Sequence, residues 1–90
     1  MMHPFMTYAD GSELIRSDLK EGGRVLVRIE SPNADDFFHS VDAWLPDYLF
    51  ENVNGFSDQD LDEWNAELHR LAPAILGLAM EEAGLYAEAV

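Results

Sequence analysis

Three aspartates that lie two residues apart resemble the opening of a calcium-binding loop. Asp58, Asp60 and Asp62 have the required alternation, because such a loop places ligands at every second position. The loop also needs glycine at its sixth position and a bidentate glutamate at its twelfth, where this chain has Glu63 and His69. The aspartates therefore indicate a helix start, where acidic side chains interact favourably with the helix dipole.

A second group of ligand-type residues comprises Asp35, Asp36, His39 and Asp42. In a helix, spacings of three and four would place them on one face, as a group of metal ligands requires. In a strand, His39 and Asp42 point to opposite faces. The apolar residues between 37 and 45 fit a period of two better than one of 3.6. We therefore expect no metal site here, and a surface histidine.

The side chains needed for nucleophilic catalysis are not arranged in a known pattern. The chain has no cysteine, and Gly22-Gly23 lacks the glycine spacing and following lysine of a phosphate loop. No serine lies in a strand-turn-helix elbow motif; the serines considered are Ser12, Ser17, Ser31, Ser40 and Ser57. The sequence therefore predicts no catalytic residue and no cofactor. It favours a protein that is not an enzyme over a small enzyme or metal protein, which stays open because carboxylate chemistry leaves no sequence signature.

The charge excludes some partners. The 90 residues carry a formal net charge of -13, which repels phosphate backbones and anionic lipids. Four basic residues lie between Arg16 and Arg28, whereas the stretch from Ser31 to Arg70 has ten carboxylates and one arginine. We expect no direct nucleic-acid binding and no membrane contact. Because no basic run precedes a long apolar stretch near Met1, we expect a cytoplasmic protein.

These residues must be positioned by one small domain, 1–90, because a chain this short has room for a single core. Turn signals and alternation predict an α+β fold with an antiparallel sheet of three to five strands. The expected strands are about 4–9, 12–16, 24–30 and 37–45, with a short edge strand or irregular segment at 48–53.

Two hairpin turns and one break organise this sheet. Asp10-Gly11 predicts a two-residue hairpin turn, in which both residues have positive φ. Gly22-Gly23 marks a second turn, and Pro32 is expected to end the third strand. In that strand Val25, Val27 and Ile29 share one face.

The fourth strand has two different faces. Phe37, Val41, Ala43 and Leu45 share one of them, and the other carries Phe38, Ser40, Asp42 and Trp44. Such alternation is typical of a sheet that is covered on one side only.

Helical structure is predicted after residue 57. Ser57 is a suitable N-cap, Asp60 occupies the capping-box position, and Phe56 and Leu61 can form a hydrophobic staple. Apolar residues then recur at spacings of three and four, namely Leu61, Trp64, Leu68, Leu71 and Ile75. Pro73 disrupts a helix interior, so we expect two helices, about 58–72 and 73–83, packed on one face of the sheet.

The segment that follows Pro73 is apolar on every side, which indicates a helix that is central in the fold or covered by a partner. We therefore predict a protein interface, a protein partner or homo-oligomer such as a dimer, formed by Ile75, Leu76, Leu78, Ala79 and Met80. A separate acidic surface is expected at Asp58, Asp62, Glu63 and Glu67.

Part of the chain resembles known sequences. From Leu45-Pro46-Asp47-Tyr48 through Gly55-Phe56-Ser57-Asp58-Gln59-Asp60-Leu61 and into the helix, it is similar to small uncharacterised bacterial families. Those have a strand that ends in Leu-Pro and a Gly-Phe-Ser segment before an amphipathic helix. The resemblance covers roughly the second half of the chain. It implies a fold and no particular activity.

Together these features predict a small acidic protein-interaction domain that is not an enzyme and that self-associates. The alternative is an inhibitor whose carboxylates imitate nucleic-acid phosphates and so block a basic nuclease, toxin or defence complex. Charge complementarity of that kind gives fast, salt-dependent association. The two hypotheses require different arrangements of the carboxylates, because mimicry requires the acids between Asp35 and Glu67 to form one stripe.

Overall fold

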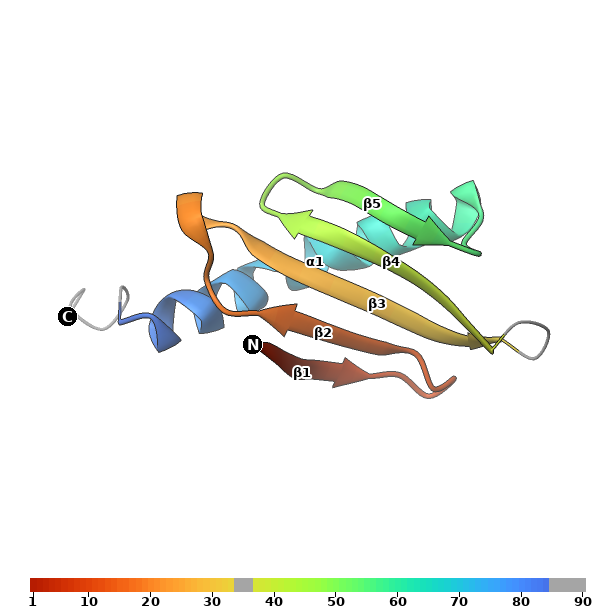
Figure 1. Cartoon of the computed structure of the whole chain (residues 1–90), viewed down its shortest axis with the longest axis horizontal. Helices are drawn as coiled ribbons and strands as arrows, with labels where there is room; N and C mark the ends of the chain where they lie inside the picture. The colour runs from red at the N-terminus through yellow and green to blue at the C-terminus, as the bar shows by residue number, and fades with distance from the viewer. Residues whose placement is uncertain (34–36, 85–90) are drawn as a thin grey trace.

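A single antiparallel sheet forms the front layer of the computed structural model, which describes residues 1–33 and 37–84 (Figure 1). Its strands follow one another in the order β1-β2-β3-β4-β5, so each pairs with its neighbour in sequence. Their bounds are Met2–Thr7, Glu13–Ser17, Val25–Asn33, Phe37–Leu45 and Leu49–Asn54. The predicted α+β class is confirmed. The segment near 48–53 is a strand, β5, whose pairing with β4 contains an irregularity in register and whose Asn52 has a φ of +56°.

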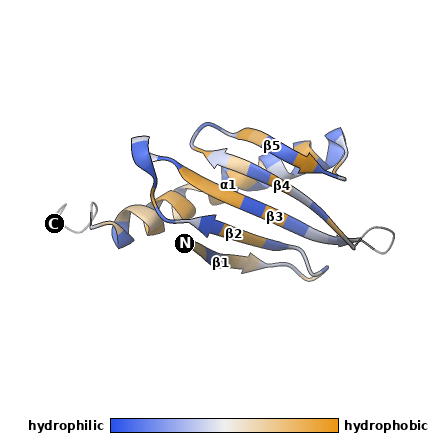
Figure 2. Cartoon of the chain, viewed as in Figure 1, coloured by the Kyte–Doolittle hydropathy of each residue, from blue (hydrophilic) through white to orange (hydrophobic). Residues whose placement is uncertain are grey.

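Helix α1, Asp58–Glu82, covers one face of this sheet and crosses behind it in Figure 1. Figure 2 shows hydrophobic and hydrophilic residues in both β2 and β3. In β3 the residues Val25, Val27 and Ile29 are buried whereas Arg28 is exposed, so one side of this strand faces the helix. The buried core joins Leu14 of β2 to three residues of β3, three of β4 and five of α1. These are Val25, Val27 and Ile29, then Val41, Ala43 and Leu45, then Leu68, Leu71, Ala72, Ile75 and Ala79.

The prediction of two helices is wrong, because α1 continues through Pro73 without interruption. Proline lacks only its own N–H, so the bond that is lost is the one to the carbonyl of His69, four residues earlier. Buried residues lie on both sides of this position: Leu71 precedes it and Ile75 follows it. Burial of both turns against the same sheet therefore keeps the two halves in one helix, while Pro73 itself is exposed.

Local residues define both ends of α1, and the capping box predicted at its start is confirmed. The Ser57 side chain accepts a hydrogen bond from the Asp60 backbone N–H at 3.1 Å, and the Asp60 carboxylate accepts one from the Ser57 N–H at 2.9 Å. This reciprocal pair is the capping box. At the other end Gly84 has a φ of +77°, which only glycine adopts without strain. The helix therefore ends where its sequence provides a left-handed residue.

The β1–β2 turn differs from the two-residue hairpin that Asp10-Gly11 predicted. The Tyr8 carbonyl accepts from the Gly11 N–H, and the Tyr8 N–H donates to the Ser12 carbonyl. Three residues therefore form the loop, with only Gly11 at positive φ. This is the common arrangement of a type I turn followed by a bulge. Asp10 has another role, because its carboxylate accepts the Ser12 N–H at 2.8 Å.

Strand β3 does not end before Pro32 but runs on to Asn33. Pro32 pairs with Phe38 of β4, whereas the pairing with β2 stops at Glu30. Pro32 is therefore in a part of β3 that has a neighbour on one side only, where proline is tolerated. The predicted core position of the Phe37 side chain lies outside the described part of the structure.

The sheet face away from α1 carries a row of mostly apolar residues. Met2 pairs with Ser17, Leu26 with Trp44, and Trp44 in turn with Leu49. Above this row the Asp42 carboxylate accepts bonds from Arg28 at 2.8 and 3.3 Å and from Asn52 at 2.9 Å. The face is thus mixed in polarity. No helix in the described ranges combines the length and the apolar character of a membrane span.

Candidate functional site

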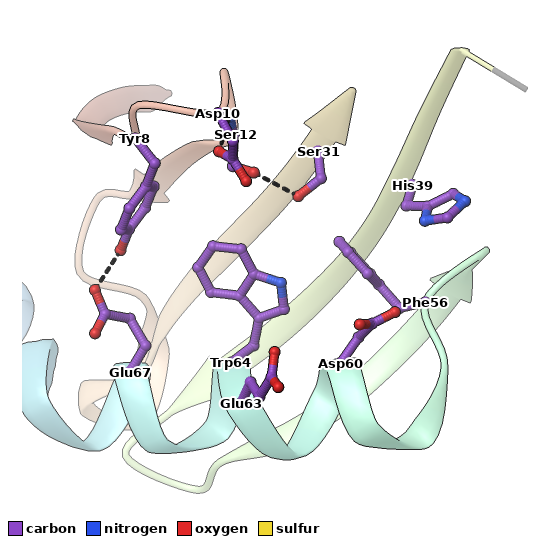
Figure 3. Close-up of a pocket in the computed structure, with 10 residues that line it drawn as sticks. All are labelled: Tyr8, Asp10, Ser12, Ser31, His39, Phe56, Asp60, Glu63, Trp64 and Glu67. Atoms are coloured by element: carbon purple, nitrogen blue, oxygen red, sulfur yellow. Dashed lines mark hydrogen bonds between the residues drawn. The ribbon is translucent and has the colours of Figure 1, made fainter. Parts of the chain in front are cut away.

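A cleft of about 440 Å³ lies between the first half of α1 and the loop that joins β1 to β2 (Figure 3). The helix contributes one wall, the β1–β2 loop contributes another, and β3 and β4 supply the residues between them. The lining combines four carboxylates with aromatic rings, one histidine and two hydroxyls. These residues are Tyr8, Asp10, Ser12, Ser31, His39, Phe56, Asp60, Glu63, Trp64 and Glu67.

Aromatic side chains form a continuous series along the cleft, with Trp64 at its centre (Figure 3). The Tyr8 and Trp64 ring centroids are 5.4 Å apart at an interplanar angle of 78°. Phe56 and Trp64 are separated by 6.4 Å, and Phe56 and His39 by 5.5 Å. All three pairs are edge-to-face, the geometry that ring quadrupoles favour. The rings therefore support one another in fixed orientations.

One hydrogen-bonded chain ties the β1–β2 loop to the helix across the cleft. The Tyr8 hydroxyl donates to Glu67 Oε2 at 2.6 Å, and Arg70 donates to both Glu67 oxygens at 2.9 and 2.7 Å. The bonds from Arg70 and Tyr8 lower the pKa of Glu67. Burial and the bond to Glu67 raise the pKa of Tyr8. At neutral pH the bridge therefore joins a carboxylate to a protonated phenol.

Two further carboxylates of the cleft are held in their charged form. Backbone and side-chain bonds from Ser57 lower the pKa of Asp60, and those from Ser12 lower the pKa of Asp10. Ser12 is buried, and its hydroxyl is 2.7 Å from the Ser31 hydroxyl. The cleft thus presents fixed negative charge beside a hydroxyl pair whose two members bond each other.

His39 lines the cleft instead of being a surface side chain, which corrects the expectation for this residue. It is partly buried, and its ring lies against Gly55. A Cβ at position 55 would clash with the His39 ring at Cδ2. Glycine at 55 is therefore required twice, by the contact with the imidazole and by its φ of +88°.

The arginines of the chain pair with carboxylates outside the cleft or at its rim. Arg24 is 2.7 Å from Asp47, and Arg28 is 2.8 Å from Asp42. Arg16 pairs with Glu82, and Arg70 with Glu67. The fold thus brings cations to carboxylates that have none near them in the sequence. The lining of the cleft itself includes no lysine or arginine.

A second group of titratable side chains lies at the opposite end of α1. His3, Asp18 and Glu82 bring ligand-type atoms within 4.8 Å of one another. The carboxylates of Asp18 and Glu82 already have cationic partners, because Arg16 donates to Glu82 and the amino group of Met1 donates to Asp18. Bonds from His3 and from that amino group lower the pKa of Asp18. The group acts as an ion-pair network that ties β1 and β2 to the end of the helix.

The structure separates the residues of the predicted acidic surface. Glu63 and Glu67 line the cleft, whereas Asp58 and Asp62 are exposed on α1 outside it. Other acids lie on the far side of the sheet, where Glu51 accepts a bond from Trp44 Nε1 at 2.7 Å. Among the residues that the structure describes, the carboxylates are therefore divided between two faces and do not form one stripe.

The predicted interface after Pro73 is also divided. Ile75 and Ala79 are buried in the chain's own core, and Leu76 and Met80 are partly buried. Leu78 is 40% exposed. The apolar surface that this segment offers to a partner is consequently small, and its role in self-association stays a prediction.

Sequence reasoning missed the part of the site that comes from the sheet. Tyr8, Asp10, Ser12 and Ser31 are brought to the helix by strand pairing, and Tyr8 meets Glu67 across 59 residues. The tyrosine beside the Asp10-Gly11 turn is the only local signal. Of the metal-ligand pattern proposed for a helical 35–42 segment, Asp35 and Asp36 lie outside the described residues, while Asp42 is bound to Arg28 on β3.

Comparisons with protein-family models, curated proteins and solved structures find no match to this chain. The candidate site therefore stands on its geometry and charge.

Proposed function

We propose that this protein is a non-enzymatic interaction domain that binds a basic partner protein, and that the acidic, aromatic cleft is its contact site. The observation that carries the proposal is the lining of the cleft: four carboxylates and three aromatic rings from Tyr8 to Glu67, with no lysine or arginine. Buried aromatic anchors and charge complementarity are the usual basis of specific protein contacts.

The pKa shifts of four side chains in the cleft favour binding over catalysis by these groups. A general acid or base works best when its pKa lies near the working pH. Here hydrogen bonds lower the pKa values of Asp10, Asp60 and Glu67, and burial raises that of Tyr8. All four groups are moved away from neutrality. The three carboxylates are suited to holding a fixed negative charge and Tyr8 to staying protonated, and none of the four is suited to transferring protons near neutral pH.

The charge also favours a different protein over a second copy as the partner. Two chains with a net charge of -13 repel each other, and the carboxylates of the cleft favour a partner segment that carries positive charge. The division of the acids between two faces likewise favours a local contact over a long stripe that imitates phosphates. A short basic segment of a folded protein satisfies both conditions, because it has the opposite charge and makes a local contact.

Charge-reversal variants test this proposal. Immobilised wild-type protein is incubated with a soluble extract of the source organism, in parallel with Glu63→Lys and Asp62→Lys. The two substitutions change the net charge equally on the same helix, but only Glu63 lines the cleft. The bound proteins are identified by quantitative mass spectrometry at low and high salt, and the purified candidate is then titrated by calorimetry.

We expect a basic protein that wild type and Asp62→Lys retain and Glu63→Lys loses, with binding that weakens as salt rises. In calorimetry Glu63→Lys should lower the affinity at least about tenfold, the range for one partner of a desolvated charge pair. Equal loss in both variants would reduce the interaction to general attraction between opposite net charges and overturn the proposal. So would equal retention in all three proteins.

A further inference from the structure

We infer that the group recognised in the cleft is an arginine side chain of the basic partner, seated on the Trp64 ring with its guanidinium against the carboxylates of Asp60 and Glu63. This inference rests on the proposed function and specifies its ligand chemistry. It makes one residue type of the partner essential.

The helix provides a two-carboxylate edge of suitable spacing. Asp60 and Glu63 are three residues apart on α1, where neighbouring side chains start about 5–6 Å from each other. The Asp60 carboxylate is fixed by the Ser57 N–H through one oxygen, Oδ2. Its other oxygen and the carboxylate of Glu63 remain to accept bonds from a ligand. A guanidinium with five N–H donors in a plane can bond both groups at once, which a lysine ammonium does less well.

The aromatic rings around Trp64 provide a second source of selectivity for arginine. Tyr8 and Phe56 hold Trp64 by edge-to-face contacts. Tryptophan gives the strongest cation–π contacts among the aromatic side chains, and arginine is the cation most often found on it. The volume of about 440 Å³ is in the range of pockets for small ligands and too small for a folded element. One side chain with its adjoining backbone fits this size.

The same chain already contains this arrangement on its other face. The Arg24 guanidinium lies 4.3 Å from the centroid of the Trp44 ring and forms an ion pair with Asp47 at 2.7 Å. At the rim of the cleft, Arg70 makes a two-bond contact with Glu67. Both contacts show a guanidinium beside a carboxylate in this fold, and the first adds a tryptophan. In the cleft the tryptophan and the carboxylates are present, and the lining contributes no guanidinium of its own.

The two tryptophans allow a direct test, because they lie on opposite sides of the sheet. Trp44→Phe leaves Trp64 as the only indole, and its fluorescence and indole N–H resonance then report on the cleft alone. This protein is titrated with three peptides that differ at one central position, which is arginine, lysine or citrulline. Citrulline keeps the shape of arginine but has no charge. Circular dichroism checks that each variant is folded.

We expect the arginine peptide to shift both Trp64 signals in a saturable way, about two- to fivefold more tightly than the lysine peptide, the factor of an exposed cation–π contact. The citrulline peptide should give no saturation in the same range. Glu63→Gln should weaken arginine binding, whereas the matched neutralisation Asp62→Asn should leave it nearly unchanged.

Three results would overturn the inference. Equal binding of the arginine and citrulline peptides would remove the role of charge, and equal binding of arginine and lysine would remove the role of the guanidinium. Equal weakening by Glu63→Gln and Asp62→Asn would show attraction to the net charge only. If in any of these cases a protein partner is still lost in Glu63→Lys alone, the proposed function stands and only its arginine specificity fails.

Discussion

Replacement of Pro73 by alanine should raise the stability of this protein. Proline in a helix interior is about 3 kcal/mol less favourable than alanine, chiefly because its ring blocks the bond to the carbonyl four residues earlier, here that of His69. Pro73 is exposed, so its removal leaves no cavity in the core. The unfolded chain gains freedom when proline is lost, which offsets about 0.4–1 kcal/mol. The net expected gain is about 2 kcal/mol.

Thermal unfolding followed by circular dichroism measures this gain. For a domain of this size each kcal/mol moves the midpoint by about 4–8 °C, so Pro73→Ala should raise Tm by about 8–16 °C. The exposed neighbour Ala74 provides a matched control, because Ala74→Gly should lower the stability by about 1 kcal/mol if the segment is helical in solution. Urea titration gives an independent estimate of both changes in the free energy of unfolding.

An unchanged or lower Tm for Pro73→Ala would refute the reasoning. It would mean that the proline shapes the helix so that both halves lie on the twisted sheet, and that a straighter helix loses contacts of Leu71 or Ile75. A stable Pro73→Ala variant with weaker binding in the cleft would also indicate that the proline shapes the helix. An insensitive Ala74→Gly would instead show that this half of the helix is not formed.

Three other substitutions have defined outcomes in the same unfolding assays. Asp42→Asn should cost about 1–2 kcal/mol at neutral pH by weakening a buried charged hydrogen bond. Because Asp42 has a lowered pKa, its contribution is complete above the unfolded pKa of about 3.9; the deficit of the variant should shrink as pH falls below this value, and a constant deficit contradicts the assignment. Gly55→Ala should destabilise more than Gly22→Ala, since both have positive φ but only the first would contact a ring, that of His39; equal losses would leave backbone strain as the sole cause. Ser57→Ala should cost about 1 kcal/mol through the lost cap, and no loss in urea titration would argue against the capping box.

Features that depend on neighbours in sequence were predictable here. Alternation identified the core face of β3, and the residues of the capping box identified the helix start, because each of these signals is local. The errors arose where tertiary contacts outweighed a local preference. Pro73 disfavours helix, yet burial of Leu71 and Ile75 on one sheet keeps the helix continuous. Pro32 disfavours a strand, yet β3 has a free side at that point and accommodates it.

The cleft could be predicted only in part, for the same reason. Glu63 and Glu67 were expected on an acidic surface, because their positions on the helix follow from spacing alone. Tyr8 and Ser31 join them only when β1, β2 and β3 pair in register, which no local pattern specifies. Sequence spacing therefore indicated the wall made by the helix and gave no sign of the wall made by the sheet.

The distribution of charge in the fold gives the strongest reason to place function in this cleft. In the sequence the basic residues are concentrated in the first third and the acids in the rest, so the whole second half looks equally acidic. The fold changes this, because Arg16, Arg24 and Arg28 reach across to Glu82, Asp47 and Asp42. Acidity at those places is largely cancelled. In the cleft, the described ion pairs include that of Glu67 with Arg70, whereas the bonds to Asp10 and Asp60 come from neutral donors. An acidic surface needed only for solubility would not have to be concave, lined with aromatic rings and without lysine or arginine in its lining, and the cleft has all three properties.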